Sequence, residues 1–378
     1  MKLLHLSDLH LGKRVNGYSM LEDQAYILQE ILTIVEREQP DAVLIAGDVY
    51  DKPIPGTEAV SLLDYFLTRL STMGKKVFLI SGNHDSPERV AFGGKLMERS
   101  GIYMSKVYDG KVEPIVLSDP YGEVAFYLLP FIKPAHVRAV FPEEEIASYT
   151  DALDCAIAHM QVSPDCRNVL LTHQFVTGAT RCDSEEISVG GSDNVDVRVF
   201  APFDYVALGH IHGPQNIGSE RVRYCGTPLK YSFSEVTHEK SVSMIELKEK
   251  GEMSLQTIPL EPLRDMIKIR GTYEELVSRE FYKKLDTNAY IHATLLDEEE
   301  VLDAIGRLRA VYPNIMSMEY DNKRSQSTGQ ISGARDVERK SEMELFAEFY
   351  ELQNNQPMSG EQEAFVKQLL KEIKGEKE

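Results

Sequence analysis

Short apolar runs alternate with longer stretches of helical periodicity along this sequence, and this alternation restricts the possible folds more than any other feature. Apolar residues spaced three and four apart predict helices at Leu21–Glu38 and Thr57–Met73. The apolar runs are short, as buried strands are, and they read KLLHL (2–6), DAVLIAG (41–47), KKVFLISG (75–82), GEVAFYLLPF (122–131), NVLLTH (168–173), DYVALGH (204–210) and SVSMIEL (241–247). Strands that alternate with helices in this way predict a layered α/β domain.

A second, smaller module begins where the pattern restarts near Pro259 and Pro262. Its predicted order is β-α-β-α-β, from DMIKIRG (265–271), a helix near Tyr273–Leu285, AYIHATL (289–295), a helix near Glu298–Val311, and IMSMEY (315–320). The polar, turn-rich stretch 321–336 that follows is typical of a linker, and two amphipathic helices come after it. We therefore predict a first domain at 1–258, a second at 262–325, a linker at 326–336 and a helical hairpin at 337–378.

The composition limits the kind of partner and the compartment. A chain of 378 residues with 42% hydrophobic and 27% charged residues is typical of a multidomain globular protein. We expect a cytoplasmic location, because no apolar run is long enough for a membrane span, Asp8 and His10 interrupt any signal peptide, and the four cysteines form no C-x-x-C pair. The net charge of −19 argues against tight metal-free binding to DNA.

Side chains suited to metal binding stand where most of the predicted core strands end. In the stretch SDLHLG, residues i and i+2 of an extended segment point the same way, so we expect Asp8 and His10 to project together. The other strand ends carry further donors, and the whole set is Asp8, His10, Asp48, Asn83, His173, His210 and His212. Each residue alone fits a turn, a cap or a core histidine, but such residues at five strand ends in chain order favour a common site.

Seven donors are too many for one cation and suit two. Asp48 stands in the middle of the order, and a carboxylate can bridge two ions. Paired cations polarise the attacking and leaving oxygens of a phosphoryl displacement and make hydroxide available near neutral pH. Imidazole, carboxylate and amide donors without thiolate favour Mn²⁺, Fe²⁺ or Zn²⁺ over Ca²⁺, and we expect Mn²⁺.

Five blocks of the sequence resemble the motifs of the calcineurin-like metallophosphoesterases: SDLHLG, GDVYD, GNHDSPER, LLTHQ and LGHIH. The resemblance implies a β-sandwich flanked by helices, with the smaller module as a capping domain over the active site. It also implies how the donors divide, with Asp8, His10 and His212 on one ion, Asn83, His173 and His210 on the other, and Asp48 shared. Outside this set, His84 corresponds to the catalytic histidine that contacts the phosphate, and Asp51 to the carboxylate that orients it.

Details of the blocks favour the nuclease branch of this family. The phosphatases have Arg-Gly after GDxxD and a glutamate ending the third block, whereas this chain has Lys52–Pro53 and Asp85. The resemblance then implies a manganese-dependent DNA endo- and exonuclease that processes double-strand ends and hairpins, as a homodimer with an SMC-like ATPase. The alternatives are a stand-alone nucleotide phosphodiesterase, a protein phosphatase, and a non-catalytic scaffold. Lys13 and Arg14, just past the first donor pair, could contact the substrate phosphate, but exposed basic residues on a loop are more often solvated, and we do not count them among the site residues.

The two terminal helices carry apolar residues on one face each. Ser359 and Gln362 have the spacing of a capping box at the start of the second helix. The apolar residues are Leu345, Phe346, Phe349, Tyr350 and Leu352 in the first helix, and Phe365, Val366, Leu369, Leu370 and Ile373 in the second. These faces either pack on each other or anchor the chain to a partner. We predict that residues 337–378 dock on the coiled coil of the ATPase.

Overall fold

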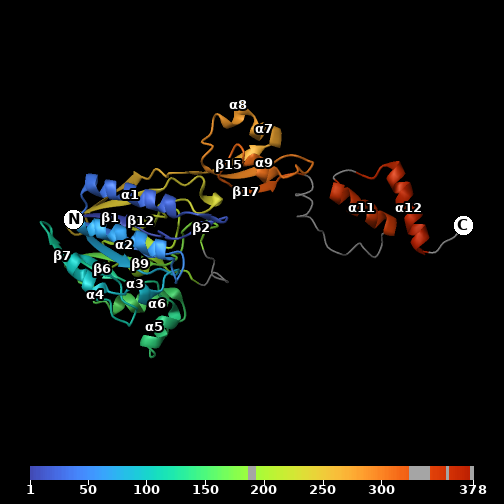
Figure 1. The fold of residues 1–378 in the computed structure, drawn as a ribbon. Helices are drawn as coiled ribbons and strands as arrows, with labels where there is room; N and C mark the ends of the chain where they lie inside the picture. The colour runs from blue at the N-terminus through green and yellow to red at the C-terminus, as the bar shows by residue number, and fades with distance from the viewer. Residues whose placement is uncertain (186–192, 323–340, 355–356, 375–378) are drawn as a thin grey trace. The chain divides into compact units, whose positions relative to one another are not determined.

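The computed structural model describes residues 1–185, 193–322, 341–354 and 357–374 (Figure 1). Its backbone contacts separate two compact units, Met1–Asp265 and Met266–Glu378. The expected linker at 326–336 lies outside the described residues.

The first unit is built on two six-stranded sheets. The order of the first sheet is β14 (Met253–Pro259), β13 (Ser241–Leu247), β1 (Lys2–Leu6), β4 (Ala42–Ala46), β5 (Lys76–Ile80) and β6 (Ile102–Met104). The order of the second is β11 (Gln215–Ile217), β12 (Ser219–Tyr224), β10 (Tyr205–Gly209), β9 (Arg167–His173), β8 (Gly122–Leu128) and β7 (Ile115–Asp119). The strands from β1 to β6 are parallel in one sheet, and those from β12 to β8 in the other. The predicted layered fold is confirmed.

A shared apolar core holds the two sheets together. Phe78 of β5 and Phe126 of β8 stack with ring centroids 4.1 Å apart, and alternate residues of β4, β9 and β10 join the same cluster. The central strands β1, β4, β5, β9 and β10 are buried on both faces, because helices cover their outer sides. This explains why the sequence shows continuous apolar runs in place of a strict alternation.

Helices line the outer faces of the sandwich (Figure 1). On one side lie α1 (Leu21–Glu38) and α2 (Thr57–Thr72), and on the other α5 (Pro134–Val140) and α6 (Tyr149–Ala158), whose apolar residues pack on the second sheet. The two long helices agree with the sequence prediction to within one residue. The remaining short elements are β2 (Arg14–Val15), β3 (Tyr18–Ser19), α3 (Pro87–Val90), α4 (Gly94–Met97), η1 (Glu98–Ser100), η2 (Val197–Phe200) and η3 (Phe233–Glu235).

The second unit begins with a parallel three-stranded sheet of β15 (Met266–Gly271), β16 (Tyr290–Leu295) and β17 (Ile315–Tyr320). The helices between them are shorter than the sequence predicted. The helix expected at 273–285 is broken into α7 (Tyr273–Val277) and α8 (Arg279–Tyr282), because Ser278 between them is extended. The helix expected at 298–311 is reduced to α9 (Ala304–Leu308), since Asp303 before it takes a left-handed conformation.

The chain ends in two helices, α11 (Glu342–Asn354) and α12 (Gly360–Lys374), which contact each other. The capping box predicted at the start of α12 is present: Ser359 N donates to Gln362 Oε1 over 2.9 Å, and Gln362 N donates to Ser359 Oγ over 3.3 Å. Gln362 Nε2 also donates to the Tyr350 hydroxyl over 2.9 Å, which joins the two helices. We refer to α11 and α12 together as the hairpin.

Candidate metal centre

The seven predicted donors meet at one edge of the sandwich, at the last residue of β9 or just past the ends of β1, β4, β5 and β10. Asp8, His10, Asp48, His173, His210 and His212 are all less than a tenth exposed, and Asn83 is half-buried. His10 Nε2 and His212 Nε2 face each other at 3.2 Å. The carboxylate of Asp8 accepts the backbone N–H of His210 at 3.0 Å. Asp8, His10 and His212 therefore form one compact group of donors.

A second group of donors surrounds the amide of Asn83. Its Oδ1 lies 3.0 Å from His173 Nε2 and 2.9 Å from His210 Nδ1. Asp48 lies between the two groups, since its Oδ2 is 3.3 Å from His173 Nε2 and 3.7 Å from His10 Nε2. The structure thus brings all seven residues together, with Asp48 in the central position.

The donor atoms have the spacing that a bound cation requires. Nitrogen ligands about 2.1 Å from a tetrahedral or octahedral ion lie roughly 3.0–3.4 Å from each other. The 3.2 Å between His10 Nε2 and His212 Nε2, with Asp8 beside them, falls in this interval. Buried imidazole, carboxylate and amide donors that converge in this way fit divalent metal ions.

Backbone strain is concentrated at the donors. Among the residues that the structure describes, eight non-glycine residues have positive φ, and four of them are Asp8 (52°), His10 (44°), Asp48 (48°) and His210 (103°). Each such residue costs on the order of 1–3 kcal/mol, a strain that typically marks functional sites. The expected extended projection of Asp8 and His10 is wrong, because β1 ends at Leu6 and both residues have a positive φ.

Glycines leave room for the donors to approach. A Cβ on Gly82 would lie 2.1 Å from Asp48 Oδ1, and a Cβ on Gly47 would lie 2.4 Å from His173 Nδ1. At Gly209 the added atom would meet the Ala46 carbonyl oxygen at 1.9 Å. Each of these glycines directly precedes a donor in the sequence. This repeated pairing is a signal that we could have used to find the site.

The electrostatics of the site favour a cation. Burial opposes the charge of Asp48, but the imidazoles of His173 and His10 outweigh it and hold the pKa of this carboxyl well below its usual range. Against burial, Asp48 in turn raises the pKa of His173 to about 9, so a cation that binds there would displace the proton of this imidazole. Burial lowers the pKa of His210 to about 3 and that of His10 well below its usual value. Asp48 is therefore ionised, and His10 and His210 keep free lone pairs at neutral pH.

His84 follows Asn83 in the sequence, and its side chain is 17% exposed; we call this more exposed side of the centre its mouth. Its backbone N–H donates to Asp48 Oδ1 over 2.9 Å, and its ring packs edge-on against His10 with centroids 4.8 Å apart. Its Nδ1 lies 3.1 Å from the backbone carbonyl oxygen of Asp51, which holds the proton on Nδ1 in the neutral ring and leaves Nε2 4.0 Å from Asp48 Oδ2.

Asp51 contacts His84 through its main chain, whereas the sequence prediction assigned the orienting role to its carboxylate. The Asp51 carboxylate accepts a 2.7 Å hydrogen bond from Lys13 Nζ and lies 3.7 Å from His10 Nδ1. The side chain of Lys13 is only 15% exposed and lies over the ring of Tyr231, so this residue is not the solvated loop residue that we expected.

Sequence reasoning missed the residues that support the donors. Asp85 accepts hydrogen bonds from the backbone N–H groups of Val49, Tyr50 and Gly82 at 2.9–3.0 Å, which ties the loop after β4 to the loop after β5. The stretch GNHD gives little sign of this role, because two of the three partners, Val49 and Tyr50, lie in a different block.

A buried network also holds His212. Its Nδ1 is 2.7 Å from Ser184 Oγ, and Ser184 donates to Glu235 Oε1 over 2.6 Å. Lys240 Nζ donates to Glu235 Oε2 over 2.5 Å and to the His212 carbonyl oxygen over 2.9 Å. These partners fix the imidazole orientation, as carboxylates behind metal-binding histidines do.

Comparisons with known proteins agree with this geometry. Residues 1–214 match the family model of the calcineurin-like phosphoesterases, and residues 262–354 match a model described as the type 5 capsule protein repressor C-terminal domain (SbcD_C). The chain is 34% identical to the SbcD subunit of the nuclease SbcCD from Staphylococcus epidermidis, over 98% of both chains. It is 35% identical to the protein of the same name from Staphylococcus saprophyticus, over 84% of both chains.

Among solved structures, a dimetal phosphatase from Danio rerio matches with a TM-score of 0.41 and 13% identity, covering 70% of this chain and 98% of that one. Within the part of the chain that the structure describes, no helix combines the length and apolarity that crossing a membrane requires.

Proposed function

The chain belongs to the calcineurin-like phosphoesterases and, within them, to the SbcD nuclease subunits, and from this premise we propose that it cleaves DNA at double-strand ends and hairpins with two Mn²⁺ ions. It is a metal-dependent phosphodiesterase of the nuclease type. The observation that carries the proposal is the convergence of seven donors and His84 on Asp48.

The residues divide the chemistry between them. Asp8, His10 and His212 would hold one cation, Asn83, His173 and His210 the other, and Asp48 both. Bound there, the cations would supply an activated water and neutralise the charge of the phosphate. His84 presents Nε2 at the mouth of the centre, where in its protonated form it donates to a phosphate oxygen or to the leaving oxygen. The Asp48 carboxylate accepts the His84 backbone N–H, and the Asp51 carbonyl oxygen accepts from the His84 ring, so these two residues hold His84 in place.

Replacing the central carboxylate tests the proposal. Asp48→Asn removes the charge shared by both donor groups, so we expect loss of one or both Mn²⁺ ions and no detectable cleavage of hairpin DNA. Elemental analysis and a cleavage assay measure the two effects. Asp154→Asn, on the exposed face of α6, is the matched control and should change neither. Two ions still bound to Asp48→Asn would contradict the central role of this residue.

We propose further that the hairpin binds an SbcC-type SMC-like ATPase, giving a heterotetramer in which two copies of this chain form a homodimer. Support for the ATPase contact comes from the apolar residues that α11 and α12 leave exposed, among them Phe349 (58%) and Phe365 (64%). Exposed aromatic residues on short helices suit a groove or coiled coil on another chain.

The homodimer surface that we propose lies on the segment from α3 to α4. Phe92 there is 83% exposed and Leu96 is 74% exposed, which is unusual for apolar side chains so close together in sequence. Sedimentation of the full chain, compared with Phe92→Ser, tests this surface. The variant should sediment as a monomer.

A further inference from the structure

A cavity of about 570 Å³ lies at the edge of the sandwich where β11 and β12 of one sheet meet β13 and β14 of the other. We call it the Arg223 cavity. Its lining includes Arg181, Gln215, Arg223, His238, Lys240 and Thr257. Gly213, which directly follows the metal-binding candidate His212, also lines it. The cavity therefore borders the metal centre.

The lining of the Arg223 cavity is basic in a chain whose net charge is −19. It contains two arginines, a lysine and a histidine against one carboxylate, that of Glu239. Two of these cations already have partners, since Arg181 is paired with Asp193 at 2.8 Å and Lys240 with Glu235 at 2.5 Å.

Arg223 is different, because it is a buried cation with neutral partners. The residue is only 6% exposed, and its guanidinium donates to Ser243 Oγ over 2.8 Å and to Asn216 Oδ1 over 2.6 Å. No carboxylate in the described part of the chain forms an ion pair with it. A buried charge is normally compensated by an opposite charge, so this guanidinium calls for an anion.

Two further buried donors of the lining have no hydrogen-bond partner among the described residues: Arg181 Nε and His238 Nδ1. Buried polar atoms are nearly always satisfied by protein, water or ligand. Gln215 holds the loop before Arg181 in place, because its side chain accepts from Thr180 N over 2.8 Å and donates to Thr180 O over 2.9 Å. The backbone beside Arg181 is thus fixed, and the His238 backbone N–H donates to the Glu235 carbonyl oxygen over 2.8 Å.

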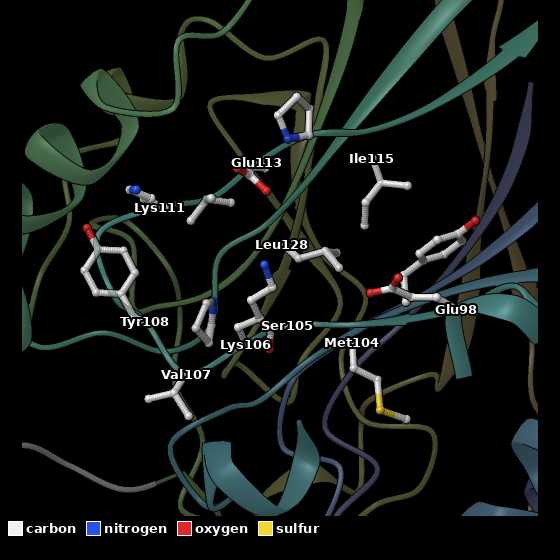
Figure 2. A pocket seen from close by; sticks show the side chains of 14 residues that line it. Glu98, Met104, Ser105, Lys106, Val107, Tyr108, Lys111, Glu113, Ile115 and Leu128 are labelled. Carbon is white, nitrogen blue, oxygen red and sulfur yellow. The ribbon is translucent and has the colours of Figure 1, made fainter. Parts of the chain in front are cut away.

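The opposite edge of the sandwich has a cavity too, and it differs in charge. That cavity measures about 200 Å³ and lies beside β6 and β7. Figure 2 shows Lys106 and Lys111 around it together with Glu98 and Glu113, so its charges are balanced. A surplus of cations is therefore not a general property of the sandwich edges.

We propose that the Arg223 cavity binds a phosphate group of a nucleotide beside the metal centre. Guanidinium groups bind phosphate oxygens with paired, charge-assisted hydrogen bonds, and a volume of about 570 Å³ is in the range of small-ligand sites. The inference rests on the proposed function, because a phosphodiesterase leaves a phosphate monoester on one product. The phosphate belongs either to a released mononucleotide or to the end of a DNA strand.

Occupancy of the cavity would affect the metal centre through Lys240. Lys240 lines the cavity and donates to the backbone carbonyl of His212 over 2.9 Å, and Gly213 connects the same loop to the wall. A phosphate bound there competes with Glu235 for Lys240 and so reaches the network that orients His212.

The test is a calorimetric titration of the full chain with deoxyadenosine 5′-monophosphate, after dialysis against a chelator so that no metal holds the phosphate. We expect Arg223→Gln to weaken binding by about tenfold or more, in line with the loss of a charge-assisted pair. Arg221→Gln is the matched control, since Arg221 lies two residues away on the same strand but is exposed. Its affinity should equal that of the wild type.

Three additions make the result decisive. Circular dichroism checks that Arg223→Gln is folded, and His238→Leu, at a half-buried position, gives a second loss of affinity if Arg223→Gln is not folded. A short oligonucleotide with a 5′-phosphate, compared with its 5′-hydroxyl form, shows whether a strand end is the source of the phosphate. Equal affinity of the wild type and both variants for every probe, or no binding to the wild type, would overturn the proposal.

Manganese-dependent cleavage, measured on the same wild-type sample, separates this inference from the proposed function. Cleavage without any nucleotide binding overturns only the phosphate site. Nucleotide binding that depends on Arg223 in a chain without cleavage supports the site and contradicts the nuclease assignment.

Discussion

In the metal centre charged and polar side chains are buried, whereas in the hairpin aromatic side chains are exposed. Asp8 and His10 are fully buried, while Phe349 on α11 is 58% exposed. Burying charge is costly unless the groups are paired or bind ions, and exposing aromatic surface is unfavourable unless a partner covers it. The difference teaches that the first unit buries the groups of its candidate centre within itself, whereas the hairpin leaves apolar surface exposed, as a docking segment would.

Removing the hairpin should give the largest effect and should leave the metal centre intact. Deletion of residues 337–378 is expected to abolish co-purification with the ATPase, because the exposed phenylalanines are lost, but to preserve Mn²⁺-dependent cleavage of single-stranded DNA. Pull-down and cleavage assays on the same preparation measure the two. A stable complex with the ATPase, formed either by the truncated chain or by Phe349→Glu in the full chain, would contradict the role that we assign to the hairpin.

Replacing His84 should do the opposite, leaving partner binding unchanged and slowing cleavage. His84→Gln removes an acid–base group at the mouth of the centre, so we expect cleavage to fall by roughly 10²–10⁴-fold. Metal content and DNA affinity should stay at wild-type values, since His84 is outside the donor set. Turnover close to that of the wild type would remove His84 from the mechanism.

A single added methyl group should disturb the metal centre at Gly82 but not the start of α12 at Gly360. In Gly82→Ala the new Cβ would lie 2.1 Å from Asp48 Oδ1, so the carboxylate must move and cleavage should fall by at least about 10²-fold. Gly360→Ala at the start of α12 is the matched control, because nothing lies within 4 Å of the added atom. A Gly82→Ala enzyme with normal metal content and cleavage would show that the centre tolerates displacement of Asp48.

The buried ion pair of the first unit should contribute more to the free energy of unfolding than the exposed ion pair on α12. Asp119 is 10% exposed and pairs with the 3%-exposed Arg167 at 2.5 Å, so Asp119→Asn should lower the free energy of unfolding at pH 7 by about 3–5 kcal/mol. The ion pair of Glu363 and Lys367 on α12 is 49% and 59% exposed. Glu363→Gln should therefore change the free energy of unfolding by less than about 0.5 kcal/mol. Urea unfolding measures both, and equal effects would contradict the contrast.

The pH dependence of this pair follows from the Asp119 carboxyl. Burial opposes its charge, but the hydrogen bonds from Arg167 and from the N-terminal amine outweigh it and hold its pKa below the usual range. The contribution to stability is therefore complete above about pH 4 and is lost as the pH falls through the folded pKa. In Asp119→Asn this part of the acid sensitivity should be missing.

The sequence by itself determined the layered architecture and the donors of the candidate centre. Continuous apolar runs can be buried on both faces only in a sheet covered by helices, and parallel strands bring their carboxyl ends to one edge. Asp48, Asn83 and His173 were therefore expected at one edge from the sequence alone. Asp48 was also expected to stand between the other donors, and the structure places it between the two donor groups. The capping box of α12 could also be predicted from the sequence, because it joins Ser359 and Gln362, which are only three residues apart.

Only the tertiary structure decided how these residues are held. The left-handed conformations of Asp8 and His10, the clearance at Gly82 and the backbone bonds to Asp85 all depend on segments that come together after folding. Arg223 and Ser243 meet across two sheets, so their contact has no local pattern in the sequence. Short helices such as α8 were missed for the same reason: helical periodicity reports which face is apolar, while the packing of the whole module sets where each helix ends.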